Sequence, residues 1–349
     1  MGVEINRFLI TVLRFHGDVL LTSPLINEIK RINPESVIDL LVYKGTGVLF
    51  EGDERINNIL EVEPSSSASL TKRLIHEIQL LRKLRKAKYD YGLFLTTQWR
   101  LALIGRFLTK IKTAGVDDLK RRKPFWIKSF STIFPHVGNG HIIERNLSAL
   151  KALGFQVNQE TPKLSLKIPP EEVDSGKKIR SKNLIVGDYC LLHPVSRRSS
   201  KQWTKEGFAK IVDHYSNLGI SVVITSGPED IETNYINDIA NLTKSNFVNL
   251  GGRTTLFELA ALIRDAKFFI GLDSVASHLA AAVGTPGVTL FGPSNPNNWR
   301  PWSNDIAVIC RNGTEDTCQK HGHLEGKYKN CLCYISAERV INKVAKIIR

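Results

Sequence analysis

The sequence lacks any apolar run that approaches the roughly 18 residues needed for a membrane-spanning helix. Its N-terminus has Glu4 ahead of a strand-like segment, Phe8 to Leu13, and lacks the layout of a secretory signal. The hydrophobic fraction of 42% and the charged fraction of 23% are those of an ordinary soluble globular protein. We therefore expect a cytoplasmic protein.

Cysteine is scarce, with five residues at positions 190, 310, 318, 331 and 333. An odd number in a chain without an export signal argues against a disulfide framework. Cys318, His321, His323, Cys331 and Cys333 cluster near the C-terminus, where they could ligate zinc. Because the Cys-x-Cys spacing matches no common closed zinc site, we expect no metal centre.

Three common motifs are also missing. The first strand is followed by Arg14-Phe15-His16-Gly17-Asp18, which has a single glycine where a dinucleotide fingerprint has three. The chain has no Gly-x-x-x-x-Gly-Lys-Ser/Thr loop and no Gly-x-Ser-x-Gly elbow. The sequence therefore gives little support to an ATPase.

What is present is an alternation of strand-like and helix-like segments over the whole chain, which predicts parallel α/β sheets. The predicted helices include one from about Val19 to Ile32, whereas the basic stretch from Arg121 to Lys128 is expected to be a surface loop. At 349 residues two domains are expected. The predicted organisation is two doubly wound, Rossmann-like domains that share a cleft: an N-terminal domain 1–165, a linker 166–183, a C-terminal domain 184–335 and a closing helix 336–349.

The most informative stretch runs from Phe268 to Gly284, where a buried strand leads into a polar pair and then a small-residue helix. Asp273 and Ser274 are placed at the carboxyl end of the strand and the start of the helix. Free backbone N–H groups and the helix dipole favour an anionic group such as a diphosphate there. Ser274 and His278 are four residues apart, so both can face one ligand. The competing interpretation is an ordinary helix cap beside a core histidine.

Further polar residues fall at other predicted strand ends: Asp18, then Ser196, Arg197 and Lys201, and then Glu229. Polar residues at four strand ends that converge on one cleft are hard to explain by capping alone. Lys201 suits the charge of a nucleotide diphosphate. Asp18, at a predicted helix start, is expected to have a low pKa and to be a weak base.

Charge is uneven along the chain, whose formal net charge is +14. Residues 72 to 128 hold sixteen Lys and Arg against four Asp and Glu, so this stretch alone carries +12. Such a surface suggests a polyanionic partner, either nucleic acid, anionic lipid or a phosphorylated glycolipid, unless it only aids solubility. The segment Arg121-Arg122-Lys123 with Trp126 is the predicted contact region.

Several of these motifs resemble glycosyltransferase family 9, the lipopolysaccharide heptosyltransferases. The resemblance covers nearly the whole chain. In the Arg14 to Asp18 segment and the late Phe291 to Trp302 segment it looks closest to the members that branch the inner core. The segments that carry it are Arg14 to Pro24, His193-Pro194 with Lys201-x-Trp203, Gly251 to Thr255, Asp273 to Ala282, and Phe291 to Trp302.

The resemblance implies a GT-B fold and an inverting, metal-independent transfer of heptose from ADP-heptose, without a cofactor and with Asp18 as general base. It implies phosphate contacts by Ser196, Arg197 and Lys201. A carboxylate among Glu229, Asp230 and Glu232 would meet the ribose, with Glu229 our choice. The implied donor site is completed by Thr255, Asp273, Ser274 and His278. This chain has Ser196-Arg197 and Ser274-Val275 where better-known members have two hydroxyl residues and Ser/Thr-Gly, so the sugar pocket can differ.

The leading hypothesis is a heptosyltransferase at the cytoplasmic face of the inner membrane, acting on a phosphorylated lipopolysaccharide core. Arg121, Arg122, Lys123 and Trp126 would meet the acceptor and anionic lipid. One alternative keeps the fold with another sugar nucleotide. Another alternative is a nucleic-acid-binding protein, but no recognition motif supports it and it leaves the strand-end residues unexplained.

Overall fold

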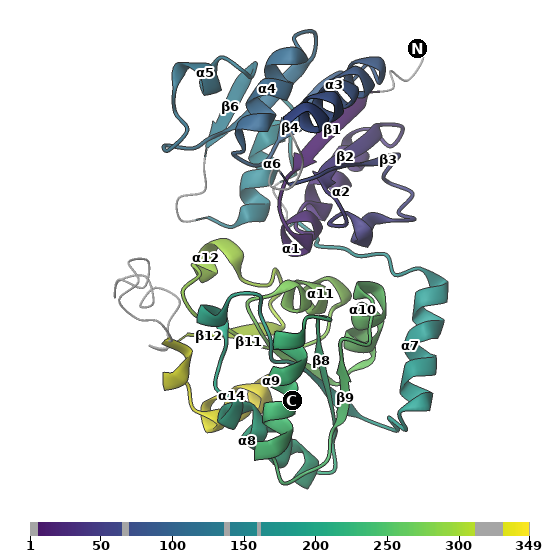
Figure 1. Ribbon diagram of the computed structural model, residues 1–349, viewed down its shortest axis with the longest axis vertical. Coiled ribbons are helices and arrows are strands. Elements are labelled where there is room, and N and C mark those ends of the chain that lie inside the picture. The colour runs from purple at the N-terminus through teal and green to yellow at the C-terminus, as the bar shows by residue number, and fades with distance from the viewer. Residues whose placement is uncertain (1–5, 65–69, 136–139, 159–161, 311–330, 349) are drawn as a thin grey trace. The chain divides into compact units, whose positions relative to one another are not determined.

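The structure is a computed structural model that describes residues 6–64, 70–135, 140–158, 162–310 and 331–348. The chain divides into two compact units, residues 1–165 and residues 166–349 (Figure 1). Each unit contains one parallel six-stranded sheet with helices packed against it. In the described part of the chain, no helix has both the length and the apolar character that a bilayer-spanning segment requires.

The sheet of the N-terminal unit has the strand order β3-β2-β1-β4-β5-β6, with every neighbouring pair parallel. The central strand β1 is buried almost throughout, as expected for a parallel strand covered on both faces. The strands are β1 (Arg7–Val12), β2 (Val37–Tyr43), β3 (Asn58–Val62), β4 (Tyr91–Phe94), β5 (Lys112–Asp117) and β6 (Thr132–Pro135).

Helices cover both faces of this sheet. On one face, apolar side chains of α3, α4 and α5 join strand residues in one core cluster that includes Leu84, Leu101 and Trp126. α2 packs against α6, and α6 also contacts β4, β5 and β6. The helices are α1 (His16–Leu20), α2 (Ser23–Ile32), α3 (Leu70–Lys86), α4 (Trp99–Phe107), α5 (Pro124–Ile127) and α6 (Ile142–Ala152).

The single helix predicted from Val19 to Ile32 is wrong, because the chain forms two helices, α1 and α2, with a break at Leu21-Thr22. Pro24 lies in the first turn of α2 and has no N–H to donate to a carbonyl one turn earlier. The Thr22 hydroxyl also donates to the carbonyl of Val19, at 2.6 Å. The break leaves Asp18 on a short helix directly after β1.

The sheet of the C-terminal unit has the order β12-β11-β10-β7-β8-β9 and is again entirely parallel. β7 and β10 lie side by side at its centre and every residue of both is buried. The strands are β7 (Tyr189–His193), β8 (Ser221–Ser226), β9 (Val248–Gly251), β10 (Phe268–Leu272), β11 (Gly287–Leu290) and β12 (Ile306–Ile309).

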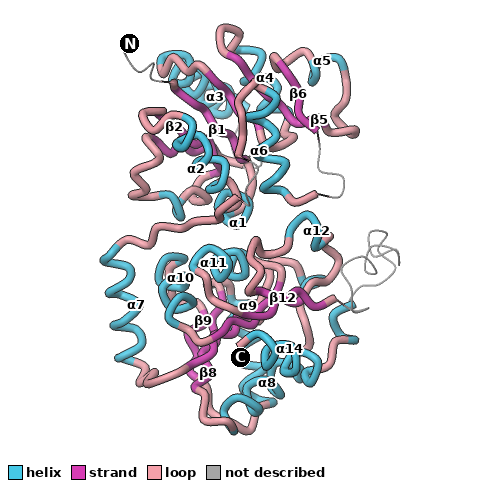
Figure 2. The backbone as a smooth tube through the Cα atoms, turned by 180° about the vertical axis from the view of Figure 1, so that it is seen from behind, coloured by secondary structure: helices cyan, strands magenta, loops and turns pink. Residues whose placement is uncertain are grey.

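The helices that pack around this sheet are seen from the other side in Figure 2. The last of them, α14, packs against α8, β11 and β12, so the closing helix is part of the core of this unit. The helices are α7 (Pro170–Lys182), α8 (Lys205–Asn217), α9 (Asp230–Leu242), α10 (Leu256–Asp265), α11 (Val275–Val283), α12 (Pro296–Trp299) and α14 (Ala337–Ile347).

The segment 166–183, predicted as a linker, forms α7 over most of its length and belongs to the C-terminal unit. α7 packs against α10, and a Cβ added at Gly176 would lie 2.9 Å from the Cβ of Ala261. The Ser175 hydroxyl donates to Glu258 at 2.5 Å. The sequence did not indicate this helix because α7 has few apolar residues and packs through a glycine.

Candidate active site

The polar pair Asp273-Ser274 lies directly after β10 and before α11, as the sequence predicts. Ser274 is the N-cap residue, and Gly284, with φ +80°, ends the helix in the left-handed conformation. The first N–H groups of α11 therefore point out of the carboxyl edge of the sheet, where the helix dipole favours an anion. Asp273 is 8% exposed, so its charge requires a nearby partner.

That partner is Lys201, whose Nζ lies 2.5 Å from Asp273 Oδ2. Lys201 ends a short 3₁₀ helix, Ser199–Lys201, in the connection between β7 and α8. Ser196, from the same connection, is buried, and its hydroxyl lies 3.4 Å from the Asp273 carbonyl. The structure thus brings Ser196, Lys201 and Asp273 together at the ends of the two central strands.

Ser274 and His278 lie one turn apart at the start of α11, and His278 is buried. The Ser274 hydroxyl makes no capping hydrogen bond, and its Oγ is buried without a hydrogen-bond partner among the described residues. The Ser274 carbonyl accepts from Ser277 at 2.8 Å. An unused hydroxyl beside the free N–H groups of α11 suits hydrogen bonding to a ligand oxygen.

The three carboxylates that follow β8, Glu229, Asp230 and Glu232, differ in burial and in hydrogen bonding. Glu232 is buried and accepts a hydrogen bond from the Gly227 N–H at 2.8 Å. Burial raises the pKa of Glu232, with the nearby charge of Glu229 acting in the same direction and that of Arg197 lowering the pKa. Glu229 is the N-cap residue of α9 with no capping hydrogen bond from its side chain, and both Glu229 and Asp230 are exposed. Glu232 therefore holds the loop, and Glu229 and Asp230 stay accessible to a ligand.

Thr255 and Arg197 complete the predicted donor set. Thr255 is the N-cap of α10 and forms a capping box with Glu258, and its hydroxyl also lies 3.3 Å from Glu172 of α7. The hydroxyl of Thr255 is therefore engaged in holding the helix start. Arg197 is exposed beside Ser196. Its charge reaches Glu232, so it lies near the loop after β8.

His193 was not among the predicted site residues, although it ends β7 at the same edge of the sheet. Its Nδ1 lies 3.0 Å from the Thr225 hydroxyl of β8, and burial lowers its pKa to about 4. His193 is therefore neutral near pH 7 and contributes no charge to the site. A histidine followed by proline at a strand end was the sequence signal for it.

In the N-terminal unit, Asp18 lies in α1 and is partly buried. Burial raises the pKa of its carboxyl, although the charges of Arg14 and Arg145 act to lower it. Hydrogen bonds to the backbone of Phe15 and of Asp18 itself also act to lower the pKa. The predicted low pKa of Asp18 is wrong because loss of hydration outweighs these effects. A carboxylate with a raised pKa is a better general base.

Arg145 is a residue that the sequence analysis missed. It lies in the first turn of α6, and its guanidinium donates to the Leu95 carbonyl, just beyond β4, at 2.8 Å. Burial lowers the pKa of Arg145 to about 10, with Arg14 acting in the same direction and Asp18 opposing it. The Nε of Arg145 is buried with no hydrogen-bond partner among the described residues. A cation in the first turn of a helix opposes the helix dipole, and that mismatch was the available sequence signal.

The predicted contact region on the basic surface is only partly as expected. Arg122 and Lys123 are exposed, and Arg122 forms an ion pair with Asp117 at 3.1 Å. The guanidinium of Arg121 lies 5.2 Å from the centre of the Trp99 ring. Trp126, however, is 0% exposed and lies on α5.

The predicted surface location of Trp126 is therefore wrong. Its indole N–H donates to the Val116 carbonyl at 2.8 Å, and its ring contacts Trp99 and Phe130 edge-on. The aromatic residues that do reach the surface here are Trp99 and Phe125. Hydrophobicity alone could not show which ring of Phe125-Trp126 faces the core.

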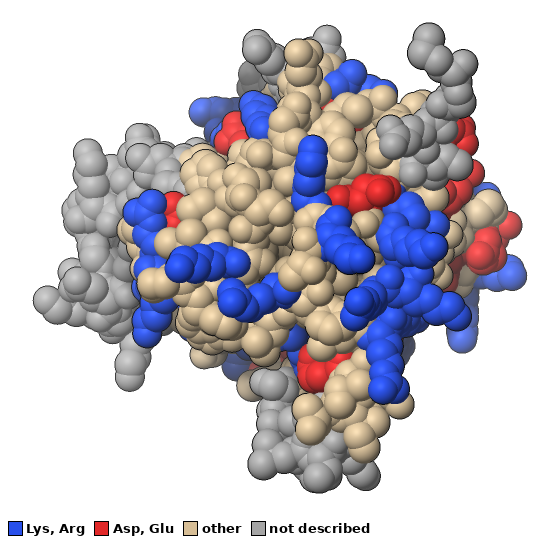
Figure 3. Space-filling model, turned by 90° about the horizontal axis from the view of Figure 1, so that it is seen from above, with Lys and Arg blue, Asp and Glu red and all other residues tan. Residues whose placement is uncertain are grey.

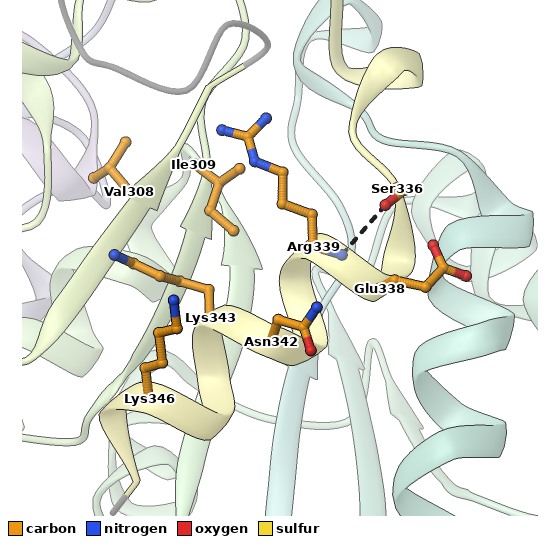
Figure 4. A pocket seen from close by; sticks show the side chains of 8 residues that line it. All are labelled: Val308, Ile309, Ser336, Glu338, Arg339, Asn342, Lys343 and Lys346. Atoms are coloured by element: carbon orange, nitrogen blue, oxygen red, sulfur yellow. Dashed lines mark hydrogen bonds between the residues drawn. The ribbon is translucent and has the colours of Figure 1, made fainter.

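A separate hollow of about 460 Å³ lies between β12 and α14 (Figure 4). Arg339, Lys343 and Lys346 of α14 line it together with Val308 and Ile309 of β12. None of the predicted donor residues borders this hollow.

No group of three or more potential metal ligands occurs within residues 6–64, 70–135, 140–158, 162–310 and 331–348. Cys318, His321 and His323 of the C-terminal cluster lie outside the described residues.

Comparison with known proteins decides the family. The family described as "Glycosyltransferase family 9 (heptosyltransferase)" matches residues 78–329. The chain belongs to glycosyltransferase family 9. It is 35% identical over 298 residues to lipopolysaccharide heptosyltransferase 3 of Escherichia coli, covering 84% of this chain and 86% of that protein. This family 9 chain is therefore a glycosyltransferase.

Solved structures support the fold of this family 9 enzyme. A family 9 glycosyltransferase from Veillonella parvula has a TM-score of 0.82 at 22% identity, covering 100% of this chain and 98% of that one. E. coli ADP-heptose LPS heptosyltransferase II has a TM-score of 0.77 at 18% identity, covering 99% and 98%. The predicted GT-B organisation of two doubly wound sheets is confirmed.

Proposed function

We propose that this family 9 enzyme transfers heptose from ADP-heptose to the inner-core oligosaccharide of lipopolysaccharide, with inversion and without a metal ion. The main structural support is the pairing of Lys201 with Asp273 beside the N-terminus of α11. A lysine, free helix N–H groups and the Ser274 hydroxyl form a suitable receptor for the diphosphate of a nucleotide sugar. The E. coli relatives named for heptosyltransferase activity and for ADP-heptose support the choice of donor.

In the proposed reaction, a hydroxyl oxygen of the acceptor attacks C1 of the donor heptose while the bond from C1 to the diphosphate oxygen breaks. Asp18 takes the hydroxyl proton as the new C–O bond forms, and ADP leaves with the bonding electrons. Attack from the face opposite the leaving group inverts the configuration at C1. The raised pKa of Asp18 suits this role. Lys201 and the α11 N-terminus would stabilise the charge on ADP.

For the remaining donor contacts, we propose that Ser196 and Arg197 approach the phosphates, and that Glu229 contacts the ribose. His278 and Ser274 would meet the sugar or diphosphate. Thr255 would act indirectly, by holding the start of α10.

The proposed acceptor is a phosphorylated lipopolysaccharide core at the cytoplasmic face of the inner membrane, where the enzyme would be peripherally bound. Arg121, Arg122 and Lys123 support this proposal because two of them are exposed cations and Arg121 covers the Trp99 ring. The alternative is transfer from another sugar nucleotide. It is supported by the Ser274-Val275 pair, which replaces the Ser/Thr-Gly of better-known members and can change the sugar pocket.

The test is incubation with ADP-heptose and a heptose-truncated lipopolysaccharide core, followed by mass spectrometry and NMR of the product. We expect a mass gain of one heptose, inversion at the anomeric carbon, and unchanged rates in EDTA. ADP-heptose binding without transfer would rule out this acceptor, and no binding would favour another donor. Retention of configuration or loss of activity in EDTA would contradict the mechanism.

A further inference from the structure

The outer faces of α3 and α4 expose apolar side chains at helical spacing. Trp99, Leu103 and Phe107 of α4 are 37%, 58% and 38% exposed, and successive members are four residues apart. Leu74 and Ile78 of α3, also four apart, are 62% and 40% exposed. These residues form stripes on the side of each helix that faces away from the sheet. Contiguous exposed apolar surface on a soluble chain indicates a binding surface.

The two stripes adjoin. The guanidinium of Arg85 on α3 lies 5.8 Å from the centre of the Phe107 ring on α4. Between these helices is a groove of about 490 Å³ with apolar and cationic lining. The residues that line it are Ile78, Leu81, Arg82, Arg85, Lys86 and Phe107.

The same surface continues onto α5. Phe125 is 42% exposed, and its ring centre is 6.1 Å from that of Trp99. Arg106 lies 5.6 Å from the centre of the Phe125 ring, and Arg121 lies 5.2 Å from that of Trp99. Three exposed rings thus each have a guanidinium against them, an arrangement in which ring and cation can share one interface.

The acidic side chains of this region are held in local interactions. Glu77 pairs with Arg100, and Asp117 lies 3.1 Å from Arg122. Asp90 and Asp118 accept backbone hydrogen bonds from Arg7 and Lys120. The Lys and Arg side chains, which greatly outnumber these carboxylates, therefore make the electrostatic potential of this surface positive. Figure 3 looks down on the end of this unit near which α3 and α4 lie in Figure 1, and Lys and Arg (blue) cover more of it than Asp and Glu (red).

We propose that the outer face of α3, α4 and α5 docks on an anionic phospholipid bilayer, with the α3–α4 groove receiving a lipid headgroup phosphate. Leu74, Leu103 and Phe107 would enter the boundary between headgroups and acyl chains, while Arg82 and Arg85 bind phosphates. A bilayer fits better than a nucleic acid because aliphatic side chains have no counterpart on a phosphate backbone. This docking assigns a surface to the peripheral membrane location proposed above and rests on that part of the proposed function, but it does not depend on which sugar is transferred.

The test is co-sedimentation of the full chain with vesicles of phosphatidylglycerol and phosphatidylcholine, and with phosphatidylcholine alone. Leu103→Glu is compared with Leu218→Glu, which alters a residue of similar exposure, 62%, in the other unit. The double variant Arg82→Glu with Arg85→Glu is compared with Lys178→Glu and Lys182→Glu on α7, which change the net charge equally.

We expect binding to the anionic vesicles only, weakened more than about tenfold by Leu103→Glu and by the Arg82/Arg85 variant, and little changed by either control. Each variant should keep its thermal unfolding temperature, because the altered side chains are exposed. Equal loss in test and control variants would overturn the proposal. So would binding to short single-stranded DNA that depends on Arg82 and Arg85 without any binding to vesicles. Neither assay contains a sugar, so failure here leaves the proposed reaction untouched.

Discussion

The ammonium group of Lys201 and the carboxylate of Asp273 lie 2.5 Å apart, although the residues are 72 positions apart in the chain. They follow the two central strands β7 and β10, which pair in parallel, so their connections leave the same edge of the sheet. Because Asp273 directly precedes the N-cap residue of α11, the pair holds the Lys201 cation close to the start of this helix.

Replacement of Lys201 by Met should weaken ADP-heptose binding by about ten- to a hundredfold, roughly 1.5–3 kcal/mol, because a charged hydrogen-bonding group is lost. The Lys201→Met effect should be smaller in an Asp273→Asn background, since the two side chains interact directly. Calorimetric titration of both single variants and the double variant measures this coupling. Strictly additive effects would show that the pair does not act as a unit.

The acid limb of the pH–rate profile should lie above the ordinary range for an aspartate, because the pKa of Asp18 is raised and the base must be ionised. Activity is therefore lost as the pH falls through this raised pKa. Arg145→Gln removes a charge that lowers the pKa of Asp18, so the limb should move to higher pH. Arg145→Lys should keep the limb near its original position. A limb that stays in place in Arg145→Gln would show that Arg145 does not influence the base.

Two of the carboxylates after β8, Glu229 and Glu232, should differ in the effect of their removal. Glu229→Ala should weaken ADP-heptose binding without changing the unfolding temperature, because Glu229 is exposed. Glu232→Ala should lower both the affinity for ADP-heptose and the unfolding temperature, since the Glu232 carboxylate accepts a hydrogen bond from the Gly227 N–H. Calorimetric titration and thermal unfolding of both variants test this difference. Unchanged affinity in Glu229→Ala would assign the ribose contact to another residue.

Trp126→Ala should reduce the free energy of unfolding by about 3–5 kcal/mol, because a fully buried ring and its hydrogen bond to Val116 are lost. Phe125→Ala is the matched control, since the neighbouring ring is 42% exposed and should cost much less. Urea unfolding followed by circular dichroism measures both. A smaller loss for Trp126 than for Phe125 would contradict the packing described for α5.

Much of the fold follows from local patterns. Buried apolar runs predicted β1 and β10. α7 escaped prediction because it packs through Gly176 and has a largely polar sequence. α7 packs against α10, which is distant in sequence.

The sequence likewise predicted some residues of the candidate site and missed others. Asp273 and Lys201 could be placed by strand ends, since parallel strands bring their carboxyl ends to one edge. Arg145 could not, because its position beside Asp18 depends on where α6 packs. The direction of the Asp18 pKa shift likewise depends on burial by residues far along the chain, which no local motif shows.

The most direct test of the central claim compares the parent enzyme with Asp18→Asn in two measurements: ADP-heptose affinity by calorimetry, and heptose transfer to a truncated lipopolysaccharide core by product mass. We predict that Asp18→Asn keeps its donor affinity and loses about 10²- to 10⁴-fold in kcat, as expected when a general base is removed. Transfer at the parent rate by Asp18→Asn would show that Asp18 is not the base. Failure of the parent enzyme to add a heptose would contradict the proposed reaction itself.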